Sequence, residues 1–132
     1  MTSQTPIGYF PDFDLDLERG QIQETLVRRL VSNDPDHLTL EVKGDYRAQS
    51  TLNHYVEVQQ RGRDGAWRDS GVRTTKADYW NVALADGVVI MVPTPKVRAL
   101  AEAAMDAGNW REMDRGDNPT RGALVPLSKL VA

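Results

Sequence analysis

Hydrophobic positions between Glu18 and Val31 recur at the spacing of an α-helix. At about 100° per residue, the apolar side chains of this segment fill one half of a helical wheel, and Glu24 borders that half. The run Ser32-Asn33-Asp34-Pro35-Asp36 ends the predicted helix, because proline restricts the residue before it to extended conformations and the others favour turns. Residues 6–16 are predicted to form an extended lead-in.

Two segments then alternate between apolar and polar residues with a period of two, which is typical of half-buried strands. In residues 38–43 the polar positions include Glu41 and Lys43, and Asp45 joins their face if the strand continues past Gly44. In residues 52–60 the alternation sets Val56 and Val58 against three polar positions on the opposite face, Tyr55, Glu57 and Gln59.

The second half of the chain predicts more strands and one well-defined helix. A short helical turn over residues 74–78 precedes a strand over residues 79–84, a turn at Asp86-Gly87 and a fully apolar, central strand over residues 88–92. Thr94-Pro95 begins a helix that ends before Gly108. Residues 123–127 predict an edge strand because of Pro126. This order predicts an α+β fold with one mixed central β-sheet flanked by helices, in the order αβββαβ.

Length and composition limit the classes of protein. The chain has 132 residues, 40% of them hydrophobic, which suits one domain (1–132) with one core. It has no cysteine, so a disulfide framework, a thiolate zinc site and a cysteine nucleophile are excluded. No apolar stretch is long enough for a membrane span, and the start Met1-Thr2-Ser3-Gln4 lacks the features of a signal peptide. We therefore expect a soluble, cytoplasmic protein.

The net charge of −3 conceals a local excess of basic residues. Between residues 61 and 76 the chain carries two acidic residues and five basic ones, namely Arg61, Arg63, Arg68, Arg73 and Lys76. This excess indicates a phosphate-bearing partner, and the alternative is a solvated hairpin loop.

Asp45 and Glu57 are candidates for a metal site. Antiparallel pairing of their two strands would bring both carboxylates to one end of the same polar face, and Glu24 is placed to approach from the first helix. Oxygen ligands of this kind suit Mg²⁺ or Mn²⁺ in phosphodiester hydrolysis. The plainer alternatives are a surface ion pair between Glu24 and Arg28, and a solvent-facing position for Glu57.

The order of these pieces resembles the PD-(D/E)xK nuclease superfamily over most of the chain. Helical Glu24, strand-end Asp45 and Glu57 have spacings similar to those of archaeal Holliday-junction resolvases. A closer likeness is to small phage and bacterial members of the superfamily. It rests on Phe13-Asp14-Leu15-Asp16, Glu41-Val42-Lys43-Gly44-Asp45, Tyr55-Val56-Glu57-Val58-Gln59, Ser70-Gly71 and Thr75-Lys76-Ala77-Asp78-Tyr79-Trp80.

The resemblance implies a restriction-endonuclease-like core and a role for each motif residue. Asp45, Glu57, the Val58 carbonyl and Glu24 would hold Mg²⁺ or Mn²⁺. Gln59 stands where the family pattern has lysine, so a catalytic lysine would come from elsewhere. Lys76 is slightly favoured by its flanking motif, and Lys43 has the simpler geometry.

The resemblance also implies the partners. The arginines at 61, 63, 68 and 73 would hold the DNA backbone. We expect a metal-dependent endonuclease acting on DNA, including branched or structured DNA, as a homodimer and without membrane association. A phage-encoded enzyme in the host cytoplasm fits the likeness.

Two alternatives remain open beside the enzyme. One is a nuclease-fold module that has lost catalysis with the lysine and binds nucleic acid or a protein. The other is a small structural or regulatory protein without metal at Asp45 and Glu57. His37 and His54 are assigned no role, since isolated histidines are more often hydrogen-bonded or surface residues. Trp67 and Trp110 are expected to be core anchors or dimer contacts rather than base-stacking residues, and core anchors are favoured.

Overall fold

The structure is a computed structural model that describes residues 39–114 and 118–132. The lead-in over residues 6–16, the helix predicted over residues 18–31 and Glu24 lie outside the described residues. In chain order the elements are β1 (Leu40–Gly44), α2 (Ala48–Thr51), β2 (Asn53–Arg61), β3 (Trp67–Asp69), the 3₁₀ turn η2 (Gly71–Arg73), β4 (Tyr79–Ala85), β5 (Val88–Pro93), α3 (Thr94–Asp106), β6 (Trp110–Met113), β7 (Thr120–Pro126) and α4 (Leu127–Leu130).

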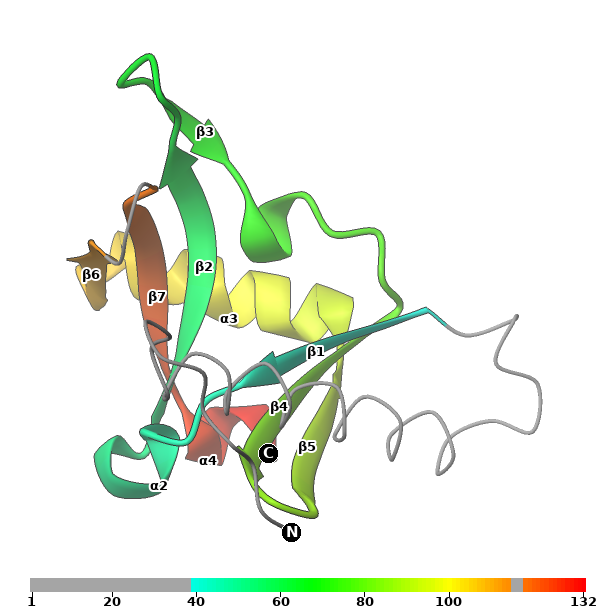
Figure 1. The fold of residues 1–132 in the computed structure, drawn as a ribbon. Coiled ribbons are helices and arrows are strands. Elements are labelled where there is room, and N and C mark those ends of the chain that lie inside the picture. The colour runs from blue at the N-terminus through cyan, green and yellow to red at the C-terminus, as the bar shows by residue number, and fades with distance from the viewer. Residues whose placement is uncertain (1–38, 115–117) are drawn as a thin grey trace, which may run out of the picture.

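The strands form two sheets (Figure 1). One has the order β1-β4-β5, with β1 parallel to β4 and β5 antiparallel to it. The other is antiparallel throughout, with the order β3-β2-β7-β6. The predicted α+β class is confirmed. The expectation of one central sheet is wrong for the described residues, because β1 pairs with β4 rather than with β2.

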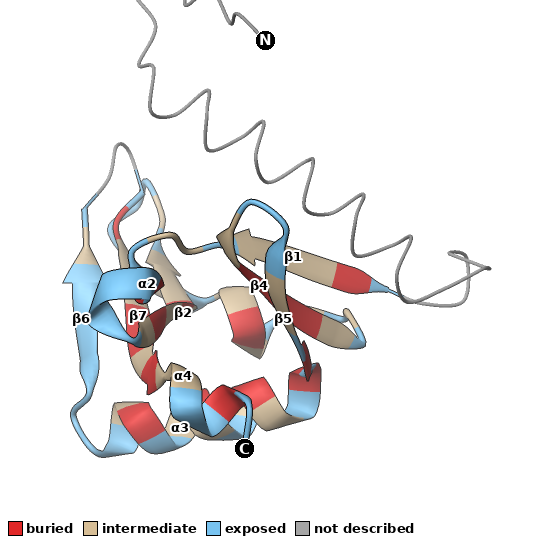
Figure 2. Ribbon diagram, turned by 90° about the horizontal axis from the view of Figure 1, so that it is seen from below, coloured by how far each residue is buried: buried red, intermediate tan, exposed pale blue. Residues whose placement is uncertain are grey.

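One hydrophobic core joins both sheets to α3. The buried face of α3 presents Val97, Ala101 and Ala104, which follow the helical spacing of three and four residues. They pack with buried side chains of β2, β7 and the first sheet, including Val56, Val58, Ala123, Val125, Trp80, Val82 and Val92. Figure 2 shows buried and exposed residues alternating along α3, which lies below the strands in that view.

The sequence places α3 correctly. Pro95 lies in its first turn, where the missing N–H would have no helical partner. Gly108 follows the helix at a φ of 78°, the left-handed conformation that glycine adopts without strain. Asp86-Gly87 forms the predicted turn between β4 and β5, with Gly87 also at a φ of 78°.

The predicted positions of β5 and β7 within their sheets are both wrong. β5 was expected to be central, but it lies at the edge of its sheet, where Val88 and Met91 are 50% and 44% exposed. β7 was expected at an edge because of Pro126, but it lies between β2 and β6. Pro126 is the last residue of β7, and the next backbone bond toward β2 is donated by Leu127 N to Leu52 O at 2.9 Å. The missing N–H of the proline therefore costs the sheet no hydrogen bond.

Short elements were not predicted. β3 and β6 have three and four residues, too few for a pattern of alternation to stand out. The turn expected over residues 74–78 is replaced by η2, which ends at Arg73. Within the described ranges, no helix combines the length and the apolar character needed to cross a membrane.

Candidate metal centre and nucleic-acid interface

Asp45 connects the two sheets. Its backbone N–H donates to Ala83 O at 2.9 Å, which continues the pairing of β1 with β4. Its carboxylate oxygen Oδ2 accepts the backbone N–H of Tyr55 in β2 at 2.9 Å. The same oxygen lies 2.8 Å from His54 Nδ1. Asp45 therefore holds the end of β1 against the beginning of β2.

His54 is part of this connection, a role that the sequence did not indicate. Trp80 Nε1 lies 3.0 Å from His54 Nε2, and the indole N–H can only donate. His54 Nε2 must then accept, so that Nδ1 carries the proton and donates to Asp45. His54 and Trp80 are each 1% exposed. The chain Trp80–His54–Asp45 thus runs from the core to the end of β1.

The environment of Asp45 favours its ionised form. Burial raises the pKa of this carboxyl, but hydrogen bonds from the His54 side chain and the Tyr55 backbone lower it, and the net direction is below the ordinary value. The Asp45 side chain is 14% exposed. It is therefore a partly buried, negatively charged group at neutral pH.

Glu57 lies on the other face of β2. Residues 54, 56 and 58 are buried toward α3, whereas Tyr55 and Glu57 alternate with them. Glu57 Oε2 accepts a hydrogen bond from Ser70 Oγ at 2.8 Å. A Cβ added to Gly71, whose φ is 57°, would overlap the Glu57 carbonyl oxygen. The Ser70-Gly71 pair is thus required for the close approach of η2 to β2.

The Asp45 carboxylate binds the edge of β2 that is turned away from β7, and Glu57 lies two residues further along that strand. The two carboxylates have different hydrogen-bond partners. The Tyr55 N–H and the Glu57 carbonyl both point away from β7, since residues two apart in a strand direct their backbone groups to the same side. Along the strand these two positions are about 7 Å apart. The antiparallel pairing that was expected to bring the carboxylates together is absent. Within residues 39–114 and 118–132, no three His, Asp or Glu side chains group as metal ligands.

The Val58 carbonyl is engaged in backbone bonding. It accepts the Ser70 N–H at 2.9 Å, and the Val58 side chain is fully buried. A carbonyl oxygen has a second lone pair, but the first is already used by the chain that follows β3.

The two candidate lysines lie at opposite ends of β1. Lys43 is two residues before Asp45, and its Nζ lies 3.0 Å from Glu41 Oε1 and 5.6 Å from the centre of the Trp80 ring. Lys76 is exposed and precedes Asp78, which bonds to Thr39 at the beginning of β1. Five strand residues, or roughly 16 Å, separate that end from Asp45. Lys43 thus lies at the Asp45 end of β1 and Lys76 near its other end, and the choice between the two lysines stays a prediction.

A β-bulge turns Gln59 away from Glu57. Glu57 is opposite Gly122 in β7, whereas Gln59 is opposite the preceding residue, Arg121. Because successive residues of β7 point to opposite faces, Glu57 and Gln59 do not share the polar face that alternation predicted. Arg121 Nη1 donates to Gln59 Oε1 at 3.4 Å.

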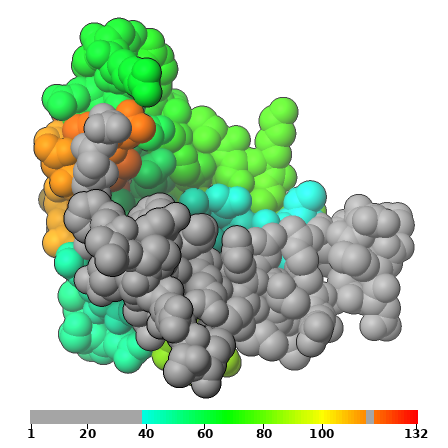
Figure 3. Space-filling model, in the orientation of Figure 1, coloured from blue at the N-terminus to red at the C-terminus, as the bar shows by residue number. Residues whose placement is uncertain are grey.

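Two of the four predicted DNA-binding arginines are held in ion pairs. Arg73 binds Glu102 of α3 through Nε at 2.6 Å and Nη2 at 3.0 Å, and Arg68 binds Asp64 through Nη2 at 2.5 Å. Arg61 lies 5.9 Å from the centre of the Trp67 ring. Arg63 is in the β2–β3 hairpin, which projects from the body of the molecule in the space-filling view (Figure 3). Arg61 and Arg63 are thus better placed for a partner than Arg68 and Arg73.

Further cationic residues were not identified from the sequence. The Arg121 guanidinium lies 3.9 Å from the centre of the Trp67 ring and 5.7 Å from that of Trp110, which is 39% exposed rather than a core anchor. Arg111 lies 5.9 Å from the Tyr55 ring centre. Their grouping depends on the pairing of β6 with β7, for which the sequence carries no local signal.

Comparison with known proteins does not assign a family. No family model, curated protein or solved structure matches this chain. Its chemistry therefore has to be argued from its own residues. These provide an ionised carboxylate at Asp45, a second carboxylate at Glu57, a nearby ammonium at Lys43 and arginines on both faces of the second sheet.

Proposed function

We propose that this protein is a metal-dependent nuclease that hydrolyses phosphodiester bonds in DNA. The observation that carries the proposal is the hydrogen bond from the Tyr55 N–H to the Asp45 carboxylate, which holds that carboxylate at the edge of β2, two residues along the strand from Glu57. Lys43 of β1 lies two residues before Asp45 and would supply a cation if its ion pair with Glu41 opens. The ordered series of motifs, with its likeness to the PD-(D/E)xK nucleases, supports the same function.

The donor set suits a hard divalent cation. Asp45, Glu57 and Glu24 would hold Mg²⁺ or Mn²⁺ through oxygen, with no sulfur or nitrogen ligand. When bound, the metal would polarise the phosphate and lower the pKa of a coordinated water. The Tyr55 N–H and His54 orient the Asp45 carboxylate, and Ser70 orients that of Glu57. Lys43 would offset the charge that develops on the phosphate.

Cleavage of supercoiled, linear, single-stranded and branched DNA in Mg²⁺ or Mn²⁺ tests the proposal. Wild type is expected to nick DNA, and Glu57→Gln and Asp45→Asn are expected to lower the rate by at least the roughly 10- to 100-fold that loss of an outer-shell partner of a metal ligand typically costs. Asp106→Asn, at the exposed end of α3, is the matched control. A homodimer, which belongs to the proposal, would also produce linear product by cutting both strands.

Circular dichroism of each variant must accompany the assay, because Asp45 also holds β1 to β2. Loss of activity in folded Glu57→Gln protein supports the proposal. Absence of cleavage by wild type, or equal rates in wild type and Glu57→Gln, contradicts it.

The second candidate function is a nucleic-acid-binding module without catalysis. It is favoured by the orientation of Gln59, which faces Arg121 and not the β2 edge at Asp45. For this candidate the same assays would give DNA binding without metal-dependent cleavage.

A further inference from the structure

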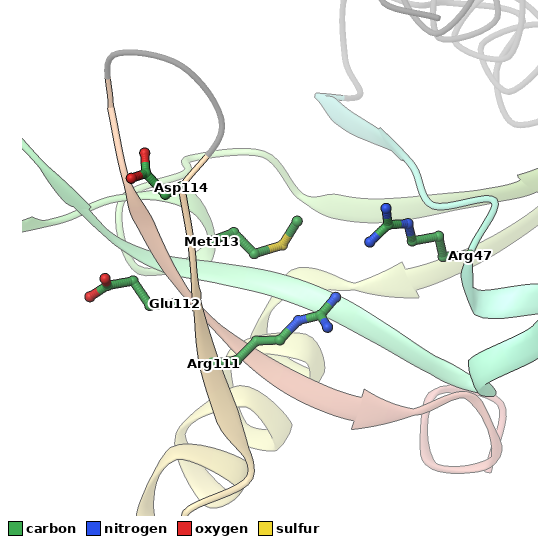
Figure 4. A pocket seen from close by; sticks show the side chains of 5 residues that line it. All are labelled: Arg47, Arg111, Glu112, Met113 and Asp114. Carbon is green, nitrogen blue, oxygen red and sulfur yellow. The ribbon is translucent and has the colours of Figure 1, made fainter.

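A surface hollow next to the candidate centre is bordered by two arginines. It has a volume of about 240 Å³ and is lined by Arg47, Arg111, Glu112, Met113 and Asp114. In Figure 4 the side chains of Arg47 and Arg111 extend toward the same space from opposite sides, whereas Glu112 points away from it. Glu112 Oε1 instead lies 3.7 Å from Arg121 Nε. We call this hollow the Arg47–Arg111 pocket.

Both arginines are available to a ligand. Each is exposed, and neither forms an ion pair with a carboxylate within the described residues. Arg68 and Arg73, in contrast, are already paired with carboxylates. An arginine without an acidic partner retains its full set of N–H donors for an oxyanion, and its planar fork matches a phosphate.

The register of the second sheet places Arg111 in line with Glu57. Arg111 of β6 is opposite Gly122 of β7, and Gly122 is opposite Glu57 of β2. Residues directly opposite each other share a face, so Arg111 and Glu57 lie on the same face, two strand spacings or roughly 10 Å apart. The Tyr55 ring lies over Gly122, and Arg111 lies over that ring. The Tyr55 ring therefore covers the sheet between Arg111 and Glu57.

Arg47 borders the pocket from the segment that follows Asp45, the other candidate metal ligand. It follows Asp45 by two residues and immediately precedes α2. Tyr55 is a common neighbour, since the Asp45 carboxylate binds its N–H and Arg111 lies 5.9 Å from the centre of its ring. A strand whose scissile phosphate lies at the two carboxylates would carry a neighbouring phosphate past this pocket.

We propose that the Arg47–Arg111 pocket binds a backbone phosphate of the DNA strand that the candidate centre cleaves. The inference rests on the proposed function and deepens it by assigning a substrate-positioning site. The arginines hold the phosphodiester through charge-assisted hydrogen bonds and contribute no base recognition.

Fluorescence anisotropy with labelled single-stranded and duplex DNA in EDTA tests this assignment without cleavage. Arg47→Ala and Arg111→Ala are each expected to weaken binding roughly three- to tenfold near 0.1 M salt and to reduce the slope of log K against log salt by about one. Lys129→Ala removes an equally exposed charge from α4 and should change neither quantity by as much. Arg47→Lys and Arg111→Lys should weaken binding less than the alanine variants.

The possible results distinguish failure of the pocket assignment from failure of the nuclease proposal. If wild type binds and cleaves DNA while Arg47→Ala and Arg111→Ala match Lys129→Ala, the pocket assignment is overturned and the nuclease remains. If wild type neither binds nor cleaves DNA, both proposals fail. Binding of a labelled polyglutamate peptide in preference to DNA, lost in Arg47→Ala, would overturn the phosphate assignment in favour of an acidic protein partner.

Discussion

In the proposed nuclease, Asp45 would combine a structural task with metal binding. As a metal-ligand candidate it needs a free carboxylate oxygen, and as a structural residue it uses Oδ2 to bind both His54 and the Tyr55 N–H. The Ala48 backbone N–H also contributes to the lowered pKa of this carboxyl. The spacing of acidic residues singled out Asp45, but it could not reveal His54, because the Trp80–His54–Asp45 chain joins residues from three different segments.

Gly71 shows a second constraint at the residue scale. Gly71 and Gly87 have φ values of 57° and 78°, but only Gly71 lacks space for a Cβ, since the Glu57 backbone lies against it. We expect Gly87→Ala to cost roughly 1–2 kcal/mol for the left-handed backbone alone. Gly71→Ala should cost at least about 2 kcal/mol more, because the chain must also move away from Glu57.

Urea unfolding of the two glycine variants measures this difference. Equal losses of unfolding free energy would show that η2 does not approach β2 as closely as described. Gly65→Ala offers a further control, since Gly65 also has a positive φ and open space.

At the scale of elements, long periodic segments were predictable and pairing was not. The alternation in residues 38–43 and the caps of α3 reflect local physics that one segment carries by itself. The pairing of β1 with β4 depends on contacts 39 residues apart, such as Leu40 with Tyr79. The bulge between Glu57 and Gln59 likewise depends on β7 and reverses the face of Gln59.

The ion pair between Arg73 of η2 and Glu102 of α3 predicts a pH-dependent contribution to stability. A hydrogen bond from Arg73 lowers the pKa of Glu102 below its ordinary value, despite opposing burial. A carboxyl whose pKa is lower in the folded state contributes stability above its unfolded pKa of about 4.3 and loses it as the pH falls through the folded pKa. Glu102→Gln should therefore lower the free energy of unfolding at pH 7, by up to about 1 kcal/mol for a partly exposed pair.

Chemical unfolding of wild type and Glu102→Gln at pH 7, 5, 4 and 3 tests the ion pair. The difference between the two proteins should be constant down to about pH 5 and shrink below the unfolded pKa of Glu102. A difference that stays the same at pH 3 would indicate that the charge of Glu102 contributes nothing.

At the scale of the whole molecule, two sheets and α3 enclose one core, and the proposed function uses the face of the second sheet that is turned away from α3. Glu57, Tyr55 and Arg111 lie on that face, Asp45 reaches its edge, and Arg47 lies across the pocket from Arg111. Composition and patterning predicted the α+β class of the fold, and the motifs singled out Asp45 and Glu57, whose role as metal ligands stays a prediction. The pocket could not be predicted, because Arg111 reaches it only when β6 pairs with β7, whereas Arg47 comes from the segment before α2.

Calorimetric titration of the full chain with Mn²⁺ tests the central claim most directly, because it does not require the correct DNA substrate. We expect saturable binding that Glu57→Gln and Asp45→Asn each weaken by at least about 10-fold, since loss of an outer-shell partner alone typically costs roughly 10- to 100-fold, while Asp106→Asn leaves it unchanged. Absence of Mn²⁺ binding to wild type, or equal affinity in wild type and Glu57→Gln, would contradict a metal centre at Asp45 and Glu57.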